Sequence, residues 1–162
     1  MMRTRRELLG LLGGGVLASG CLGSAPFHPR AYDDAVRVES LAVDFAEDKS
    51  GLLDVGLQVK NPSSDAASVS FVDFELWVDG RRVAAGQQQL DAALPPNAEI
   101  PLRVLFPLAA ERVVAVTGTQ PLPVRVRGGV LLRFGTTERR APFRVQGSRR
   151  MTHVPPLDAG GD

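Results

Sequence analysis

The chain has 162 residues, enough for one domain with a substantial core, and its 19 Lys and Arg residues nearly balance its 18 Asp and Glu residues. This balance argues against nucleic acid as the main partner, because domains that bind nucleic acid carry a clear excess of positive charge. A single cysteine excludes an intramolecular disulfide.

Residues 1–20 have the composition of a secretory signal peptide, which is removed and takes no part in the fold. Their apolar run, residues 8–18, contains four glycines and is far shorter than the roughly 20 residues that span a bilayer. Residues 17–21 resemble a bacterial lipobox, in which cleavage between Gly20 and Cys21 leaves a cysteine that carries diacylglyceryl and N-acyl groups, palmitate among them. We therefore expect the lipid on Cys21 to anchor the protein to a membrane.

The start of the signal indicates an export route. Arg5 and Arg6, within residues 4–9, resemble a twin-arginine motif, which is an address read by a receptor. Leu22 follows the cysteine, where lipoproteins of the inner membrane often have aspartate. We expect a lipid-anchored protein of the bacterial cell envelope, at the outer membrane and facing the periplasm.

Three segments follow the signal peptide. Residues 21–35 contain Gly, Ser and Pro without a periodic pattern, which predicts a lipid-anchored tether. Residues 36–147 form the predicted folded domain. Residues 148–162 include Pro155-Pro156 and Gly160-Gly161, which predict a disordered tail.

Alternating apolar and polar residues within the domain predict strands with one buried and one solvated face. The runs cover residues 36–45, 53–60, 72–78, 100–108, 124–134 and 141–145. Asp79-Gly80 predicts a tight hairpin that leads into a further strand. A change of phase in the first run predicts a bulge near Ser40. Pro101 and Pro107 lack the amide hydrogen that a central strand needs, so their strand is expected at a sheet edge.

One short helix is predicted at residues 109–117, with Glu111 near its start and Gly118 as its cap. Together the elements predict an all-β fold. It is an antiparallel β-sandwich of about seven strands, similar to fibronectin type III and immunoglobulin domains, with this one helix.

Several motifs resemble a known family. A strand ends in Asn61-Pro62, a hairpin strand covers residues 74–80, and the small-residue segment 83–86 follows. This order resembles the type 2 late-embryogenesis-abundant (LEA) proteins and their water-stress and hypersensitive-response (WHy) domain. The resemblance covers roughly residues 36–146. It implies a fibronectin-like sandwich with one short helix, a turn at residues 83–86, a role in desiccation and stress protection, and no established catalytic residues.

The Asn61-Pro62 step has a structural explanation of its own. Asparagine tolerates turn backbone and hydrogen-bonds nearby amides through its side chain, and proline stops a strand from continuing. We therefore expect a structural role for this motif.

Charge is uneven along the chain. Residues 31–99 hold 13 acidic and 5 basic residues, whereas residues 100–150 hold 2 acidic and 10 basic residues, all arginine. One interpretation is an arginine face for anionic lipid headgroups or a polyanionic envelope polymer. The other, which we favour, is that strands from the two halves lie side by side and their charges pair across the sheet.

The residues predict no catalytic, cofactor-binding or metal site. His28 falls in the tether and His153 in the tail, so neither has a fixed partner. Asp44, Glu47 and Asp48 lack the spacing of an EF-hand loop and fit a solvated hairpin tip. Trp77 lies on the polar side of its strand, where it covers an edge or marks a contact surface.

These observations predict a non-enzymatic, membrane-anchored envelope lipoprotein with a WHy-type domain, monomeric and protective under stress or desiccation. The alternative is an accessory lipoprotein that binds an envelope protein through an exposed edge strand or through the Trp77 face. A hydrolase of envelope polymers is the weakest hypothesis, because no nucleophile–base pair is evident.

Overall fold

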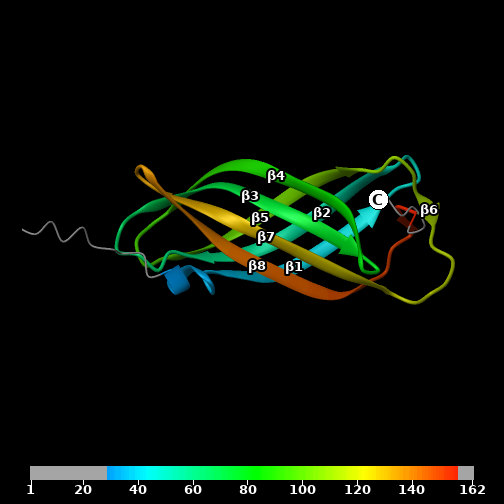
Figure 1. Cartoon of the computed structure of the whole chain (residues 1–162), viewed down its shortest axis with the longest axis horizontal. Helices are drawn as coiled ribbons and strands as arrows, with labels where there is room; N and C mark the ends of the chain where they lie inside the picture. The colour runs from blue at the N-terminus through cyan, green and yellow to red at the C-terminus, as the bar shows by residue number, and fades with distance from the viewer. Residues whose placement is uncertain (1–28, 157–162) are drawn as a thin grey trace, which may run out of the picture.

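The long strands form two sheets that lie face to face (Figure 1). Apolar side chains on alternate residues of these strands are buried between them. The computed structural model describes residues 29–156. Its elements in chain order are the 3₁₀ helix η1 (Pro29–Tyr32) and strands β1 (Val36–Phe45), β2 (Ser50–Lys60), β3 (Ala67–Val78), β4 (Arg81–Leu94), β5 (Glu99–Ala109), β6 (Val114–Ala115), β7 (Leu122–Phe134), β8 (Thr137–Arg149) and β9 (His153–Val154).

The strands form two antiparallel sheets. The first sheet has the order β5-β2-β1-β9-β6, and the second has the order β4-β3-β7-β8. Figure 1 shows the second sheet stacked on β1, β2 and β5. The all-β sandwich and its seven long strands confirm the predicted fold class. β5 lies at an edge of the first sheet, as Pro101 and Pro107 predict.

The core lies between the sheets and is built by the predicted alternation. In β2, Leu53, Val55, Leu57 and Val59 are at most 1% exposed, while their neighbours along the strand are partly exposed. Phe74 of β3 and Phe106 of β5 contact each other across the two layers, with ring centroids 4.3 Å apart. Burial of these faces supplies most of the driving force for folding.

Two local features of the strands agree with the predictions from the sequence, a bulge in β1 and a tight turn after β3. The β1–β2 register shifts between Val38 and Ser40, which confirms the expected bulge. Asp79 and Gly80 both have positive φ angles, 49° and 81°, at the tip of the β3–β4 hairpin. Positive φ at both central residues is typical of the type I′ turns that match strand twist.

The predicted helix at residues 109–117 is wrong. β5 continues to Ala109, and Val114–Ala115 form β6, which pairs with β9. Two amides in and beside this segment bond to residues far away in the chain: Ala110 N donates to Lys49 O and Val116 N donates to Thr152 O, both at 3.0 Å. A helix this short has little stability of its own, so these longer-range bonds decide the conformation.

Both predicted flanking segments contribute to the fold. Tyr32 and Ala35, placed in the tether, are buried, and the Tyr32 ring meets Phe134 edge-on at 6.1 Å. The expected tail from residue 148 is wrong for residues 148–156, because β8 runs to Arg149, β9 follows, and Met151 and Val154 are buried. The rest of the predicted tail lies outside the described residues.

The small-residue segment 83–86 is a strand interior and not a turn. β4 continues through Gly86, which pairs with Phe74. A Cβ at Gly86 would lie 2.9 Å from Cε1 of the Phe74 ring, so glycine is needed for this ring to lie against the neighbouring strand.

Candidate functional site

The residues that carry the predicted signal lie outside the described part of the chain. They are Arg5, Arg6, Gly20 and Cys21, so export, cleavage and lipidation stay predictions. Within residues 29–156 the structure has no helix with the length and hydropathy needed to span a bilayer.

The acidic hairpin tip stabilises its own turn. Asp48 Oδ1 accepts hydrogen bonds from the backbone N and the Oγ of Ser50, at 3.0 Å and 2.5 Å. These bonds lower the pKa of Asp48. Asp44 accepts a bond from Phe45 N at 2.9 Å. Among the described residues no group of three His, Cys, Asp or Glu side chains is placed to hold a metal ion.

Asn61 joins two of the chain segments that cross between the sheets, β2 to β3 and β4 to β5. The residue is fully buried in the loop from β2 to β3, and its Nδ2 lies 2.8 Å from Asp65 O, 3.3 Å from Leu94 O and 3.1 Å from Pro95 O. Its Oδ1 accepts a bond from Ser63 N at 2.9 Å. Since Leu94 and Pro95 lead from β4 to β5, one side chain holds both crossovers together. This geometry accounts for the Asn-Pro motif.

Opposite charges pair across strands, as the favoured interpretation of the charge pattern predicts. Two pairs join the acidic and basic halves of the chain, Arg103–Asp54 and Arg140–Asp73, with nitrogen–oxygen distances of 2.5 and 2.6 Å. A further pair, Arg82–Glu75 at 3.1 Å, lies within the acidic half. The hydrogen bond from Arg103 lowers the pKa of Asp54. The hydrogen bond to Asp73 raises the pKa of Arg140. The arginine side chain of each pair is at least half exposed, so each pair contributes little to stability.

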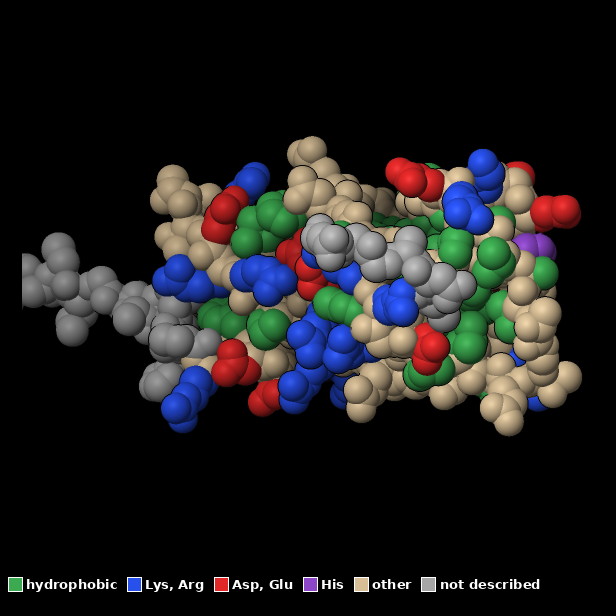
Figure 2. Space-filling model, turned by 45° about the vertical axis from the view of Figure 1, so that its right-hand side comes forward, with side chains coloured by type: hydrophobic (Ala, Val, Ile, Leu, Met, Phe, Trp, Pro, Cys, Tyr) green, Lys and Arg blue, Asp and Glu red, His purple; other side chains and the backbone are tan. Residues whose placement is uncertain are grey.

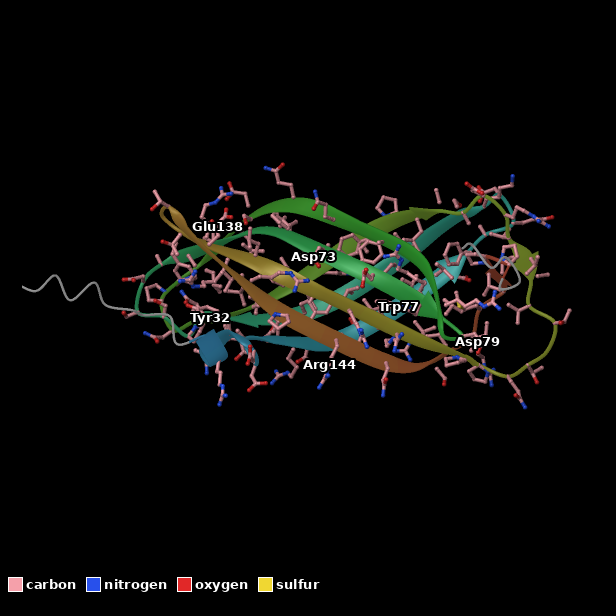
Figure 3. The ribbon with its side chains drawn as sticks, viewed as in Figure 1. Tyr32, Asp73, Trp77, Asp79, Glu138 and Arg144 are labelled. Carbon is pink, nitrogen blue, oxygen red and sulfur yellow. The ribbon has the colours of Figure 1, made fainter. Side chains whose placement is uncertain are left out.

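Three arginines on the outer face of the second sheet are left out of this pairing. Arg125, Arg127 and Arg144 make no ion pair with any described residue. The guanidinium carbons of Arg125 and Arg127 lie 4.7 Å and 5.3 Å from the ring centroid of Trp77, within cation–π distance. Figure 3 shows Trp77 on β3 and Arg144 on β8, on the two sides of β7. β3 is an inner strand of its sheet, so Trp77 does not cover a sheet edge, and its role in a contact surface stays a prediction.

The register brings like charges together. Arg127 on β7 is paired directly with Arg144 on β8. Directly opposed like charges destabilise a sheet. Figure 2 shows basic side chains gathered near the middle of the visible face, with acidic side chains beside them.

Three adjoining hollows lie over these residues. The arginine hollow, about 350 Å³, is lined by Arg125, Arg127, Arg144, Val145 and Gln146. The tryptophan hollow, about 370 Å³, shares Arg125 and Gln146 with it and is also lined by Trp77, Gly80, Pro123, Val124, Gly147 and Ser148. A third hollow of about 640 Å³ shares Arg127 and Arg144 and extends to the carboxylates of Asp33, Asp34, Asp73 and Glu75.

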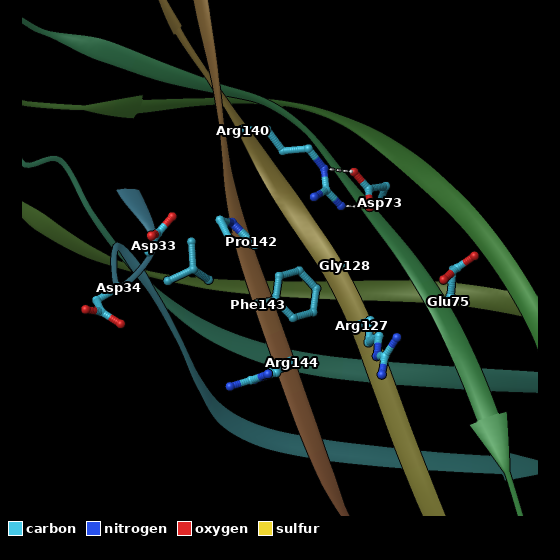
Figure 4. A pocket seen from close by; sticks show the side chains of 11 residues that line it. Asp33, Asp34, Asp73, Glu75, Arg127, Gly128, Arg140, Pro142, Phe143 and Arg144 are labelled. Atoms are coloured by element: carbon cyan, nitrogen blue, oxygen red, sulfur yellow. Dashed lines mark hydrogen bonds and ion pairs between the residues drawn. The ribbon is translucent and has the colours of Figure 1, made fainter. Parts of the chain in front are cut away.

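The third hollow has its charges partly neutralised. In Figure 4 dashed lines join Arg140 to Asp73, and none joins Arg127 or Arg144 to the carboxylates drawn. The arginine hollow has no carboxylate in its lining. It is therefore the most electropositive of the three, and an anion is the ligand that its chemistry suits.

The sequence alone did not single out this cluster. Arg125 and Arg127 share a face because they are two residues apart on one strand. Arg144 joins them only through the pairing of β7 with β8, which no local pattern specifies. The uneven distribution of arginine was the available signal.

No family model matches the sequence, and no curated protein matches it. Solved structures do resemble it. A protein from Archaeoglobus fulgidus shares 13% identity at a TM-score of 0.51, with 74% of this chain and 98% of that chain covered. AT1g01470 from Arabidopsis thaliana shares 13% identity at a TM-score of 0.52, with 73% and 85% covered.

A third structure carries a description. At2g46140.1, described as a candidate late embryogenesis abundant (LEA) protein, shares 14% identity at a TM-score of 0.50, with 75% of this chain and 71% of that chain covered. At such identities the likeness shows the fold alone. The chain therefore shares its β-sandwich fold with a protein described as a candidate LEA protein.

Proposed function

We propose that this protein is a non-enzymatic lipoprotein of the bacterial cell envelope, whose LEA-type sandwich protects envelope components during dehydration and related stress. The observation that supports the protective role is the fold shared with At2g46140.1, described as a candidate LEA protein. The lipobox-like residues 17–21 support the anchor, and the twin-arginine-like Arg5 and Arg6 support export.

The anchor would hold the domain close to the membrane. η1 begins at Pro29 and its Tyr32 is buried, so the link to the lipid starts at Cys21 and ends at about residue 29. A chain of eight residues reaches at most roughly 30 Å. The sandwich would therefore act at the membrane surface and would not range through the periplasm.

The test of the anchor uses the native gene. Wild type is compared with Cys21→Ala, and Ser24→Ala serves as a control that leaves the lipobox intact. We expect the wild-type N-terminal peptide to begin at an acylated Cys21 by mass spectrometry, and the Cys21→Ala protein to leave the membrane fraction. A wild-type protein that retains residues 1–20 without acyl groups would contradict the anchor.

The test of the protective role is survival of a deletion strain after drying and osmotic shock. We expect reduced survival, restored by the wild-type gene and restored less well by Cys21→Ala. Equal survival of the deletion and parent strains would contradict a protective function while leaving the anchor untouched.

An edge strand favours the alternative function, an accessory lipoprotein that binds a partner. β4 lies at the edge of the second sheet, contains no proline, and has no charged residue from Val83 to Leu90. Such an edge is open to addition of a strand from another protein. Crosslinking in membranes followed by purification tests this role. One stoichiometric partner that is lost when Gln88→Pro blocks the edge supports it, and the absence of any such partner contradicts it.

A further inference from the structure

The outer face of the second sheet carries two adjoining hollows, the arginine hollow and the tryptophan hollow, that have no assigned role. We propose that the arginine hollow and the tryptophan hollow together bind a small soluble phosphate ester, with the phosphate between Arg125, Arg127 and Arg144 and the organic group beside Trp77. This activity goes beyond the proposed protective role and does not depend on the lipid anchor.

The charge balance of this face supports a bound anion. Asp73 is paired with Arg140, and Glu75 with Arg82. The three arginines of the arginine hollow make no ion pair with any described residue. The register sets Arg127 opposite Arg144 on one side and opposite Glu75, which already pairs with Arg82, on the other. A phosphate between the arginines would replace the repulsion of Arg127 and Arg144 by charge-assisted hydrogen bonds.

Trp77 holds two of these arginines along the sheet. Cation–π contacts place the guanidinium groups of Arg125 and Arg127 over the indole ring. Arg125 Nε is buried and has no hydrogen-bond partner in the described structure. A buried donor without an acceptor is costly, so a shift of this guanidinium that brought Nε to a phosphate oxygen would remove that cost. Arginines held in place lose less freedom on binding than mobile ones.

The size and lining of the two hollows suit a small ester. Volumes of about 350 Å³ and 370 Å³ fall in the range of small-molecule sites. The arginine hollow supplies the positive charge, while Trp77, Pro123 and Gly147 give the tryptophan hollow a less charged wall. A sugar ring fits this second part, because one of its faces packs on apolar surface and its hydroxyl groups bond to polar side chains such as Gln146.

The same face disfavours an anionic membrane as the source of the phosphate. Asp33, Asp34, Asp73 and Glu75 line the adjoining hollow. A flat anionic bilayer that covered the arginines would also lie against these carboxylates and would be repelled by them. A small ester can occupy the arginine hollow, whose lining holds no carboxylate.

The chain supplies its own reporter for the test, since Trp77 is its only tryptophan. The full-length protein is titrated with glucose 6-phosphate and with inorganic phosphate at constant ionic strength, and Trp77 fluorescence is recorded. We expect a saturable change with both probes and tighter binding of glucose 6-phosphate. In Arg127→Gln/Arg144→Gln the affinity should fall at least tenfold.

Two variants control for folding and for charge. Arg103→Gln makes the same substitution on the first sheet and should bind as wild type does. Arg144→Gln alone should still weaken binding. Because Arg144 is exposed, this variant should fold normally and replaces the double variant if that one folds poorly. An equal response to sodium chloride, or unchanged affinity in the arginine variants, would overturn the proposal. Binding to phosphatidylglycerol vesicles without any response to glucose 6-phosphate would assign the face to membranes and would also overturn it.

Discussion

Replacing Asn61 by alanine is the sharpest test of how the two sheets are held together. The substitution removes a fully buried amide that contacts three carbonyl oxygens through Nδ2 and one backbone amide through Oδ1. Nδ2 has only two hydrogens, so the longest contact, 3.3 Å to Leu94 O, shares a donor. The side chain therefore supplies about three full hydrogen bonds, each contributing about 1 kcal/mol.

We expect Asn61→Ala to lower the free energy of unfolding by about 3 kcal/mol, since the lost bonds act together on both crossovers. Urea denaturation followed by Trp77 fluorescence measures this directly. Ser64→Ala, an exposed neighbour, should change stability by less than about 0.5 kcal/mol. A cost below about 1 kcal/mol for Asn61→Ala would refute the reasoning, because the backbone bonds would then suffice to hold the crossovers.

An isosteric change tests the direction of these bonds. Asn61→Asp keeps the acceptor for Ser63 N but turns a carboxylate oxygen toward three carbonyl oxygens. Burial and repulsion would raise the pKa of this carboxyl above its unfolded value, so the protonated form is favoured in the fold. The stability lost at pH 7 should therefore be recovered in part as the pH falls through the raised pKa. A variant as stable as wild type at pH 7 would contradict the assigned orientation of the amide.

Three further predictions address other parts of the fold. Gly128→Ala should cost about 2–3 kcal/mol in chemical denaturation, because the new Cβ would collide with the Asp73 carbonyl oxygen and the Phe143 ring. Tyr32→Ala should cost about 3 kcal/mol by the same measurement, since it empties a buried site at the docked end of η1. Arg103→Gln should cause a small, salt-sensitive loss of stability near pH 7, measured by thermal unfolding from pH 2 to 8. The hydrogen bond from Arg103 lowers the pKa of its carboxylate partner, so this contribution is present above the unfolded-state value of about 3.9 and is lost as the pH falls through the folded pKa.

Each of these has an outcome that would contradict it. Gly147→Ala is the control for the first, since its Cβ meets only the flexible end of Arg149 at 3.1 Å, and equal effects at both glycines would exclude the proposed clash. A loss below about 1 kcal/mol for Tyr32→Ala would mean that η1 is not docked in solution. A difference between Arg103→Gln and wild type that grows as the pH falls would assign the stabilisation to a group other than Asp54.

Several elements are determined by their own residues. β2 follows from the alternation of Leu53, Val55, Leu57 and Val59, because a strand with one buried face needs an apolar residue at every second position. The β3–β4 turn follows from Asp79-Gly80, since few other pairs adopt two positive φ angles in succession. The edge position of β5 follows from Pro101 and Pro107, which cannot donate ladder hydrogen bonds.

Other elements depend on distant partners. Residues 109–117 have a locally helical composition, yet carbonyl oxygens of Lys49 and Thr152 capture the neighbouring amides and keep the segment extended. Met151 and Val154 fall within the predicted tail. Both are nevertheless buried, at and next to β9, which pairs with β1 and β6. Gly86 resembled a turn residue, but the Phe74 ring on the next strand is what requires a glycine there.

The sequence by itself determined the strand periodicity, the turns and the all-β fold, because these depend on side chains within a few residues of one another. It also predicted pairing of the acidic and basic halves, which Arg103–Asp54 and Arg140–Asp73 exemplify. Only the tertiary structure decided that Arg125, Arg127 and Arg144 make no ion pair with a described residue. The register between β7 and β8 sets Arg144 beside Arg127, and the pairing of β3 with β7 sets Trp77 beside Arg125. Such neighbours arise from the pairing of separate strands, so no local pattern in the chain could predict them.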